Sequence, residues 1–247
     1  MIVTWLEDVT PRPRRIALGQ FDGVHLGHRA LIVGCDTVVT FDPHPQTIVA
    51  PERPITILTA LERKVRLVAS LGVRELVLVR FDRTRAAQSP EAFVSDVLVG
   101  RLCATQVSVG DNFRFGHRGR GDAAALGADP RFATRVLGLL HHRGLPVSSS
   151  RIRALVAAGE LDAASELLGS RVHLAATVSG APSRTGLRLD FDVHAALPPD
   201  GAYVCSTVLG TATLEIVRSG DGDGWGRLTG VPAAVGSTIG LELSRRG

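Results

Sequence analysis

The sequence contains few cysteines, and those it has lie far apart. Cys35, Cys103 and Cys205 are odd in number and follow no short repeated spacing, which argues against a disulfide framework and for a reducing, cytoplasmic compartment. Long hydrophobic runs are also missing, because no apolar run approaches the roughly 18 residues that suggest a membrane span. The first seven residues lack the basic and apolar regions of a secretory signal. We therefore expect a cytoplasmic protein without a membrane partner.

Lysine is equally scarce, since Lys64 is the only one among 28 basic residues, and the formal net charge is +4. The arginines are scattered, without the stripe of aromatic and basic residues that nucleic-acid-binding surfaces show. A guanidinium group also suits the oxygens of a small phosphate ligand. We therefore expect no nucleic-acid partner and favour a small polyphosphate substrate.

The first two-thirds of the chain alternates short apolar strands with helical patterns. The expected strands are 15–21, 37–41, 75–81 and 106–109, with a weaker candidate over 131–140, and helices are expected over 59–71 and 89–102. This order predicts an α/β fold with a parallel sheet and helices on both faces, which binds ligands at the carboxyl ends of its strands. The crossover from His25 to Cys35 has only about ten residues, near the minimum for such a connection. Its helix should therefore have about two turns.

The pattern changes after Gly169. Residues 148–168 predict two helices with a break near Gly159, and the chain then becomes strand-like. The expected strands are 171–178, 187–193, 202–209, 213–217 and 238–243. They predict a small antiparallel barrel or sandwich, so we place one domain over 1–169 and another over 170–247. Residues 219–227 lack the spacing and closing glutamate of a calcium loop and are expected to form a hairpin turn.

The first candidate site segment lies between the first strand and the first helix, at Gly19–His28. A glycine turn there lets backbone N–H groups approach a phosphate closely. His25 and His28 lie three residues apart, so both rings can face the same phosphate, and imidazole donates a hydrogen bond in either charge state. The alternatives are two surface histidines or a partial zinc site, and the zinc site would need a third ligand.

The second segment is Val147–Arg153, where three serines precede two arginines. Serines at a helix start are usually only caps. Here the hydroxyls, the helix N-terminus and the guanidinium groups together would make a second anion cradle. Two cradles suggest a polyphosphate that is held at both ends.

The remaining two segments each follow a predicted strand. Two prolines stiffen Thr40–Pro45, from which Asp42 and His44 project. Val109–Gly116 combines glycine, a carboxylate and aromatic rings, which could hold a flat base by stacking and edge hydrogen bonds. The alternatives are a rigid turn for the first segment and a loop anchored by two phenylalanines for the second.

In this order the four segments resemble the bacterial bifunctional riboflavin kinase/FMN adenylyltransferase family, also called FAD synthetase, over residues 16–169. The resemblance implies a Rossmann-like nucleotidylyltransferase domain that transfers AMP from ATP to FMN, giving FAD. His25-Leu-Gly-His28 matches the superfamily's HxGH motif. Ser148, Ser150 and Arg153 match its ISxTxxR motif, with Ser150 in the usual threonine position. Gln20 replaces a common asparagine.

The resemblance also implies a role for each matching position. His25, His28 and Arg153 would be catalytic, and Asp42, His44 and Phe115 would bind the acceptor. ATP would be bound by Gly19, Phe21, Asp22, Gly23, Gly27, Gly110, Asp111, Asn112, Phe113, Ser148, Ser149, Ser150 and Arg151. Mg²⁺ would enter with ATP, without ligands assigned on the protein.

The second domain departs from the family. In the family, the riboflavin kinase barrel carries a Pro-Thr-Ala-Asn motif. This chain instead has "GLRLDFDV" over 186–193. We therefore expect a degenerate barrel without kinase activity. Asp190 and Asp192 could be replacement metal ligands, but the alternation favours a half-exposed strand. Two further alternatives are a nucleotidylyltransferase with another phosphorylated acceptor and a non-catalytic protein that binds flavin or nucleotide.

Overall fold

The computed structural model describes residues 1–180, 186–218 and 224–246, and the chain divides into two compact units. The first unit contains Met1–Ile55 and Leu61–His141, and the second contains Thr56–Ala60 and His142–Gly247.

A six-stranded parallel sheet forms the centre of the first unit, in the order β1-β4-β3-β2-β5-β8. The strands are β1 (Ile2–Trp5), β2 (Arg14–Leu18), β3 (Thr37–Asp42), β4 (Glu75–Arg80), β5 (Ala104–Gly110) and β8 (Ala133–Leu137). The predicted α/β class and parallel sheet are confirmed. The sequence did not indicate β1, because this four-residue edge strand has no fully buried position.

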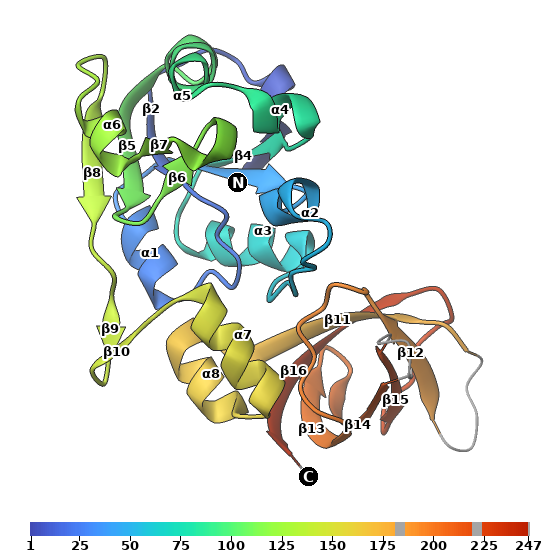
Figure 1. Ribbon diagram of the computed structural model, residues 1–247. Helices are drawn as coiled ribbons and strands as arrows, with labels where there is room; N and C mark the ends of the chain where they lie inside the picture. The colour runs from blue at the N-terminus through green and yellow to red at the C-terminus, as the bar shows by residue number, and fades with distance from the viewer. Residues whose placement is uncertain (181–185, 219–223, 247) are drawn as a thin grey trace. The chain divides into compact units, whose positions relative to one another are not determined.

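Successive strand residues face opposite cores, as the two-residue period of a strand requires. Ile16 and Leu18 belong to one apolar cluster, whereas Ala17 between them belongs to the other. The cluster that contains Ala17 packs against α1 (Leu26–Ile32) and α3 (Leu61–Ser70). Figure 1 shows these two helices on one side of the sheet and α5 (Pro90–Ala92) and α6 (Ala123–Gly127) on the other. Helices therefore cover both faces, as predicted.

The helix predicted over 89–102 is present, but most of it has π geometry. Ser89 caps it by accepting from the backbone N–H of Ala92 at 3.1 Å, and Pro90 occupies the first turn. Phe93–Arg101 then forms a π-helical segment. Residue periodicity does not distinguish α from π geometry over so few residues.

Several short elements connect the main ones, and pattern arguments did not indicate them. They are α2 (Pro45–Val49), α4 (Arg83–Ala87), the 3-10 turns Leu6–Asp8 and His117–Gly119, and the ribbons β6 (Arg114–Phe115) with β7 (Gly121–Asp122) and β9 (His141–His142) with β10 (Leu145–Pro146). Each has at most five residues, which is too few to show a hydrophobic period.

The second unit combines two helices with a closed barrel. α7 (Ser149–Ala158) ends at Gly159, whose φ of +80° matches the predicted break, and α8 (Leu161–Leu168) follows. The antiparallel barrel has the order β11-β12-β15-β14-β13-β16. Its strands are β11 (Val172–Val178), β12 (Leu187–Phe191), β13 (Gly201–Thr207), β14 (Gly210–Arg218), β15 (Gly224–Thr229) and β16 (Thr238–Arg246).

The barrel is closed, which decides between the two predicted architectures. The hairpin turn expected over 219–227 was predicted too long, because β15 begins at Gly224 and pairs antiparallel with β14. Residues 219–223 lie outside the described part of the chain. The sequence pattern did not indicate β15 because Gly224 and Gly226 interrupt it, and glycine is uncommon in strands. No helix among the described residues is long and apolar enough to cross a membrane.

Candidate active site

The turn after β2 has an unusual backbone. Phe21, Gly23 and Val24 have positive φ angles of 52°, 90° and 42°, a region that residues other than glycine seldom adopt. Phe21 and Val24 are fully buried in the core beneath the turn, so packing holds them in this conformation. A side chain at Gly19 would begin 3.3 Å from the Phe21 ring. The predicted glycine turn is therefore present and is anchored by apolar side chains.

The two histidines are stacked at the start of α1. The His25 and His28 ring centroids lie 3.6 Å apart with 14° between the planes, and the Phe21 ring meets His28 edge-on at 5.3 Å. His25 is 5% exposed and caps α1, its Nδ1 accepting from the backbone N–H of His28 at 3.3 Å. A neutral His25 that accepts at Nδ1 carries its proton at Nε2. His25 can therefore donate from Nε2.

Lys64 was not predicted as a site residue. Its side chain extends from α3 to the carboxyl ends of β2 and β3, where Nζ donates to the Gln20 carbonyl at 2.8 Å and lies 3.5 Å from Thr40 Oγ1. Burial lowers the pKa of Lys64, and the charges of Asp22 and Asp42 act in the opposite direction. The one available signal was compositional, since the only lysine of the chain lies on the buried face of a predicted helix.

Asp42 and His44 lie where β3 leads into α2. Asp42 is the last residue of the strand, and His44 caps the helix by accepting from the Gln46 N–H at 3.2 Å. Pro45 takes the first helical position, which its fixed φ favours. Both predicted side chains are thus held at the carboxyl edge of the sheet.

An aromatic pocket lies beside this loop. The rings of Phe41 and Phe81 are 5.8 Å apart, those of Phe41 and Phe93 are 6.3 Å apart, and those of Phe93 and Phe115 are 5.7 Å apart. The cavity has a volume of about 290 Å³. Its lining is formed by Phe41, Pro45, Val49, Phe81, Arg85, Ala86, Gln88, Phe93, Arg114, Phe115, Gly116, Arg118 and Gly119. A cavity lined mainly by aromatic and other apolar side chains, with three arginines and a glutamine among them, suits a flat organic ligand that carries polar groups.

Only Phe115 of the predicted acceptor residues lines this pocket directly. Phe81 and Phe93 come from separate segments, and no motif in the sequence indicates that the fold brings them together. Phe113 stacks on Phe115 at 5.8 Å from outside the lining. The two phenylalanines predicted to anchor the 109–116 loop are therefore packed on each other, and Phe115 also lines the pocket.

The turn after β5 contains the other predicted nucleotide-binding residues of this unit. The Asp111 N–H donates to the Leu137 carbonyl at 2.9 Å, and the Phe113 N–H donates to the Gly110 carbonyl at 3.1 Å. A side chain at Gly110 would begin 3.2 Å from Asn112 Oδ1. The side chains of Asp111 and Asn112 are exposed at the carboxyl edge of the sheet.

The predicted second cradle belongs to the second compact unit. Ser148 caps α7, its Oγ accepting from the Arg151 N–H at 3.3 Å. Ser149, Ser150, Arg151 and Arg153 lie in the first turns of that helix, and Ile152 between the arginines is fully buried. The helix start with hydroxyl and guanidinium groups is therefore present, and its sharing of one ligand with His25 stays a prediction.

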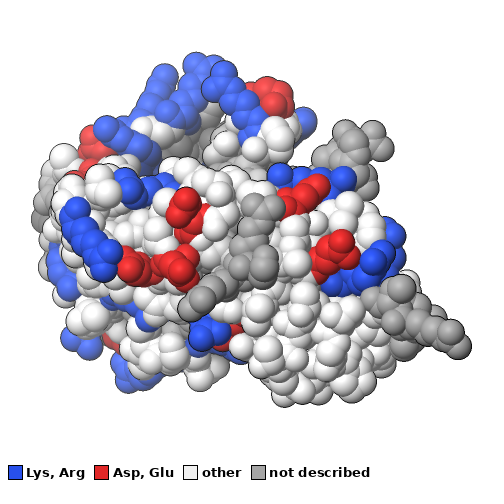
Figure 2. All heavy atoms as spheres, turned by 90° about the horizontal axis from the view of Figure 1, so that it is seen from below, with Lys and Arg blue, Asp and Glu red and all other residues white. Residues whose placement is uncertain are grey.

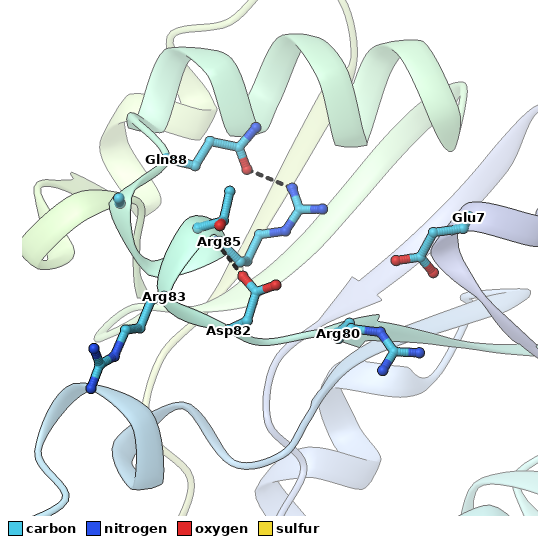
Figure 3. Close-up of a pocket in the computed structure, with 8 residues that line it drawn as sticks. Glu7, Arg80, Asp82, Arg83, Arg85 and Gln88 are labelled. Carbon is cyan, nitrogen blue, oxygen red and sulfur yellow. Dashed lines mark hydrogen bonds between the residues drawn. The ribbon is translucent and has the colours of Figure 1, made fainter.

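A larger groove of about 700 Å³ contains none of the predicted site residues (Figure 3). Asp82 accepts from the Arg85 N–H at 2.7 Å, and Arg85 donates to Gln88 at 2.6 Å. Arg80 lies over the Trp5 ring at 4.8 Å. Figure 3 shows the Arg83 side chain directed away from Arg85. These charged side chains do not point toward a common position, so the groove is not a competing candidate for the active site.

Known proteins support the sequence resemblance. A family described as FAD synthetase matches residues 8–151. Bifunctional riboflavin kinase/FMN adenylyltransferases of Listeria monocytogenes and Escherichia coli K12 are 38% and 36% identical over 167 residues, which cover 62% of this chain and 53% of each relative. The Bacillus subtilis protein of that name is 28% identical over 76% of this chain and 65% of its own length. The chain thus spans about half the length of the first two relatives.

The fold as a whole also has a solved counterpart. A structure titled macrolide-efflux protein from Streptococcus pneumoniae matches with a TM-score of 0.82 and 20% identity. The match covers 100% of this chain and 91% of that one. At this identity it supports the fold alone.

Proposed function

The chain belongs to the FAD synthetase family, and from this premise we propose that it transfers the adenylyl group of ATP to FMN, giving FAD and pyrophosphate. The observation that carries the proposal is the stacked pair of His25 and His28 on a strained turn at the carboxyl edge of the sheet. The aromatic pocket opens at the same edge of the first unit. Phosphate donors and a place for a flat ring therefore occur together.

The proposed reaction is a single displacement. An FMN phosphate oxygen attacks the α-phosphorus of ATP, the bond to the β-phosphate oxygen breaks, and pyrophosphate leaves with the electron pair. The nucleophile is already an anion, so the enzyme has to position the groups and stabilise charge. His25 would donate from Nε2, and His28, stacked on it, would stabilise charge at the reacting phosphorus.

The flavin ring would occupy the aromatic pocket. Phe115 lines this pocket, while Asp42 and His44 lie at the end of the strand that supplies Phe41. This arrangement supports the acceptor role given to the three predicted residues. The adenine would lie near the Gly110–Phe113 turn.

Arg153 and the serines of α7 would hold the β- and γ-phosphates as they depart. α7 has ten residues, and its N-terminus, with guanidinium groups nearby, suits such an anion. The compact units divide after His141, and the proposed functional boundary differs from this division: α7 and α8 would belong to the transferase domain, residues 1–169, and the barrel to 170–247.

Mg²⁺ would enter with ATP. In the described parts of the chain no group of three or more His, Cys, Asp or Glu side chains could hold a metal ion. We assign Mg²⁺ no ligand on the protein, because this ion commonly keeps several waters and binds substrate phosphates. When bound, the ion would neutralise phosphate charge.

The barrel would have lost kinase activity. In β12 the residues Leu187, Leu189 and Phe191 are buried, and Asp190 is exposed and paired with Arg188 at 3.3 Å. Asp192 accepts from the His194 N–H at 2.7 Å. The half-exposed strand is therefore observed, and both carboxylates are used locally, which supports a degenerate site.

We propose a cytoplasmic location for the protein. The three cysteines form no disulfide, in keeping with the cytoplasm. On the face drawn in Figure 2 most of the surface carries neither charge, and several of the acidic side chains lie beside basic ones. The proposed partners are ATP and FMN, which fit the family of the chain, without nucleic acid or a membrane.

Incubation with Mg²⁺, ATP and either FMN or riboflavin, followed by chromatography, tests the proposal. We expect FAD from FMN and no flavin product from riboflavin. A folded protein that makes no FAD from FMN would refute the transferase assignment, and FMN formed from riboflavin would refute the loss of kinase activity.

A further inference from the structure

The helix that carries the histidine pair is unusually short. β2 ends at Leu18 and β3 begins at Thr37, and α1 between them has seven residues. The last four carbonyl groups of an α-helix lack partners within the helix. For α1 this is more than half of its length, and a helix of this size is not stable alone. Its orientation must therefore come from contacts outside the helix.

Arg135 on β8 supplies such contacts at the carboxyl end of α1. Its Nη2 donates to the carbonyl oxygens of Leu31 and Val33, the second at 2.9 Å, and its Nε donates to Ser108 Oγ on β5 at 3.0 Å. Cys35 Sγ lies 3.5 Å from the same hydroxyl. One side chain thus joins the end of α1 to two strands of the sheet.

The guanidinium group suits this position for two reasons. Its positive charge interacts favourably with the carboxyl end of a helix, and its planar fork donates in several fixed directions at once. A lysine would offer a single ammonium centre on a flexible stem. The contact therefore depends on arginine chemistry and not only on a positive charge.

We propose that Arg135 is a positioning residue for adenylyl transfer, which holds α1 at the angle that presents the His25–His28 stack to the phosphates. This inference rests on the proposed function. His25 caps the same short helix and His28 lies in its first turn, so a tilt at the far end of the helix moves both rings. A displacement of about 1 Å at a reacting group can cost on the order of 100-fold in rate.

The test compares Arg135→Met with Arg135→Lys and with the control Arg131→Met. Arg131 is exposed, precedes the same strand and pairs with Asp129 at 2.6 Å. We expect kcat for FAD formation to fall about 10-fold in Arg135→Met, as a displacement smaller than 1 Å would produce. KM for FMN should change little. Arg135→Lys should recover part of the loss, and Arg131→Met should match the parent.

Two further measurements separate positioning from a general loss of stability. In a His28→Ala background, Arg135→Met should cost less than about twofold, because residues that act through one another are not additive. Amide hydrogen exchange over residues 26–33 should become faster in Arg135→Met and stay unchanged in Arg131→Met. An equal kcat loss in both backgrounds, or unchanged exchange, would overturn the inference.

Failure of the proposed function would be recognised separately. If the parent protein makes no FAD, the adenylyl transfer assignment falls, and the exchange measurement alone decides whether Arg135 anchors α1. Faster exchange in Arg135→Met would uphold that anchoring, and unchanged exchange would refute it.

Discussion

The His28 ring contacts two other rings, since His25 is stacked on it and Phe21 packs against it in a T-shaped arrangement. An imidazole fixed in this way can stabilise charge without reorganising during the reaction. We predict that His28→Ala lowers kcat for FAD formation by about 10²–10³-fold, the usual effect of removing one preorganised donor. Steady-state kinetics on the purified variant measures this directly.

The control is His141→Ala, which removes an exposed histidine on β9 that the proposed site does not include. It should keep the kcat of the parent. A His28→Ala variant with nearly unchanged turnover would remove His28 from the chemistry.

Lys64 gives a direct electrostatic test, because it is the only lysine of the chain. Lysine labelled with ¹⁵N at Nζ should give one side-chain NMR signal. We predict that it titrates below the ordinary value of 10.5, because burial lowers its pKa. Asp22→Asn should lower that pKa further, since the Asp22 charge raises it.

The direction in which pH changes the stability follows from the difference in proton binding between the folded and unfolded chain. Between the folded-state pKa and 10.5 the unfolded chain binds more protons at Lys64 than the folded chain does. This residue therefore makes stability rise with pH within that window. The urea-unfolded protein is the internal control, and a folded-state pKa at or above the unfolded value would contradict the burial argument.

At the scale of the elements, the two edges of the parallel sheet have different tasks. The carboxyl edge carries the proposed site, and the amino edge carries an ion-pair network centred on Glu75 at the start of β4. Glu75 lies 2.6 Å from Arg12 and 2.7 Å from Arg14, which is fully buried. Thr37 at the start of β3 also donates to this carboxylate at 3.3 Å. The network joins β2, β3 and β4.

We predict that Glu75→Gln lowers the free energy of unfolding by about 3 kcal/mol, because the Arg14 charge would stay buried without its partner. Burial acts to raise the pKa of Glu75, but its hydrogen bond with Arg14 and the charges of Arg14 and Arg12 lower it overall. Its contribution is therefore complete above the ordinary value of 4.5 and is lost as pH falls through the lower folded-state pKa.

Urea unfolding of the parent, Glu75→Gln and the exposed control Glu62→Gln between pH 3 and 7 would check this. The difference between parent and Glu75→Gln should shrink toward the acid end. A constant difference across this range would show that the carboxylate charge is not what stabilises the sheet edge.

The start of α7 gives a second prediction at this scale. Arg153→Ala should raise KM for ATP about 10-fold, the effect of losing one charge-assisted hydrogen bond, and leave KM for FMN nearly unchanged. The exposed Arg66→Ala on α3 is a matched control. Unchanged dependence on ATP would make Arg153 an ordinary surface residue of the helix.

The elements that the sequence predicted are those with enough residues to show a period. β4, α3 and α8 follow their apolar spacing, whereas the four-residue β1 and the two-residue β6 cannot. The π geometry of Phe93–Arg101 depends on packing, which a residue pattern does not contain. In the site, the histidine turn was predictable from its local motif. The contacts of Phe81 and Lys64 were not, because they join segments that are remote in sequence.

At the scale of the whole molecule, the first unit contains the features of the proposed site, and the second contains the packing pattern of a barrel. The first unit keeps the turn, the histidine pair and an aromatic pocket at one sheet edge. The second keeps a closed barrel whose strand β12 alternates buried leucine and phenylalanine with exposed charges. A fold can persist through its core after its catalytic residues change, since packing and chemistry depend on different positions. The proposed loss of kinase activity would leave the barrel a structural role.

The most direct test of the account follows the phosphorus atoms. The full chain would be incubated with FMN, Mg²⁺ and ATP labelled with ³²P at either the α- or the γ-position. Adenylyl transfer predicts that the α-label appears in FAD and the γ-label in pyrophosphate, in equal amounts. Absence of the α-label from FAD, with FMN and ATP left unchanged by a folded protein, would contradict the central claim.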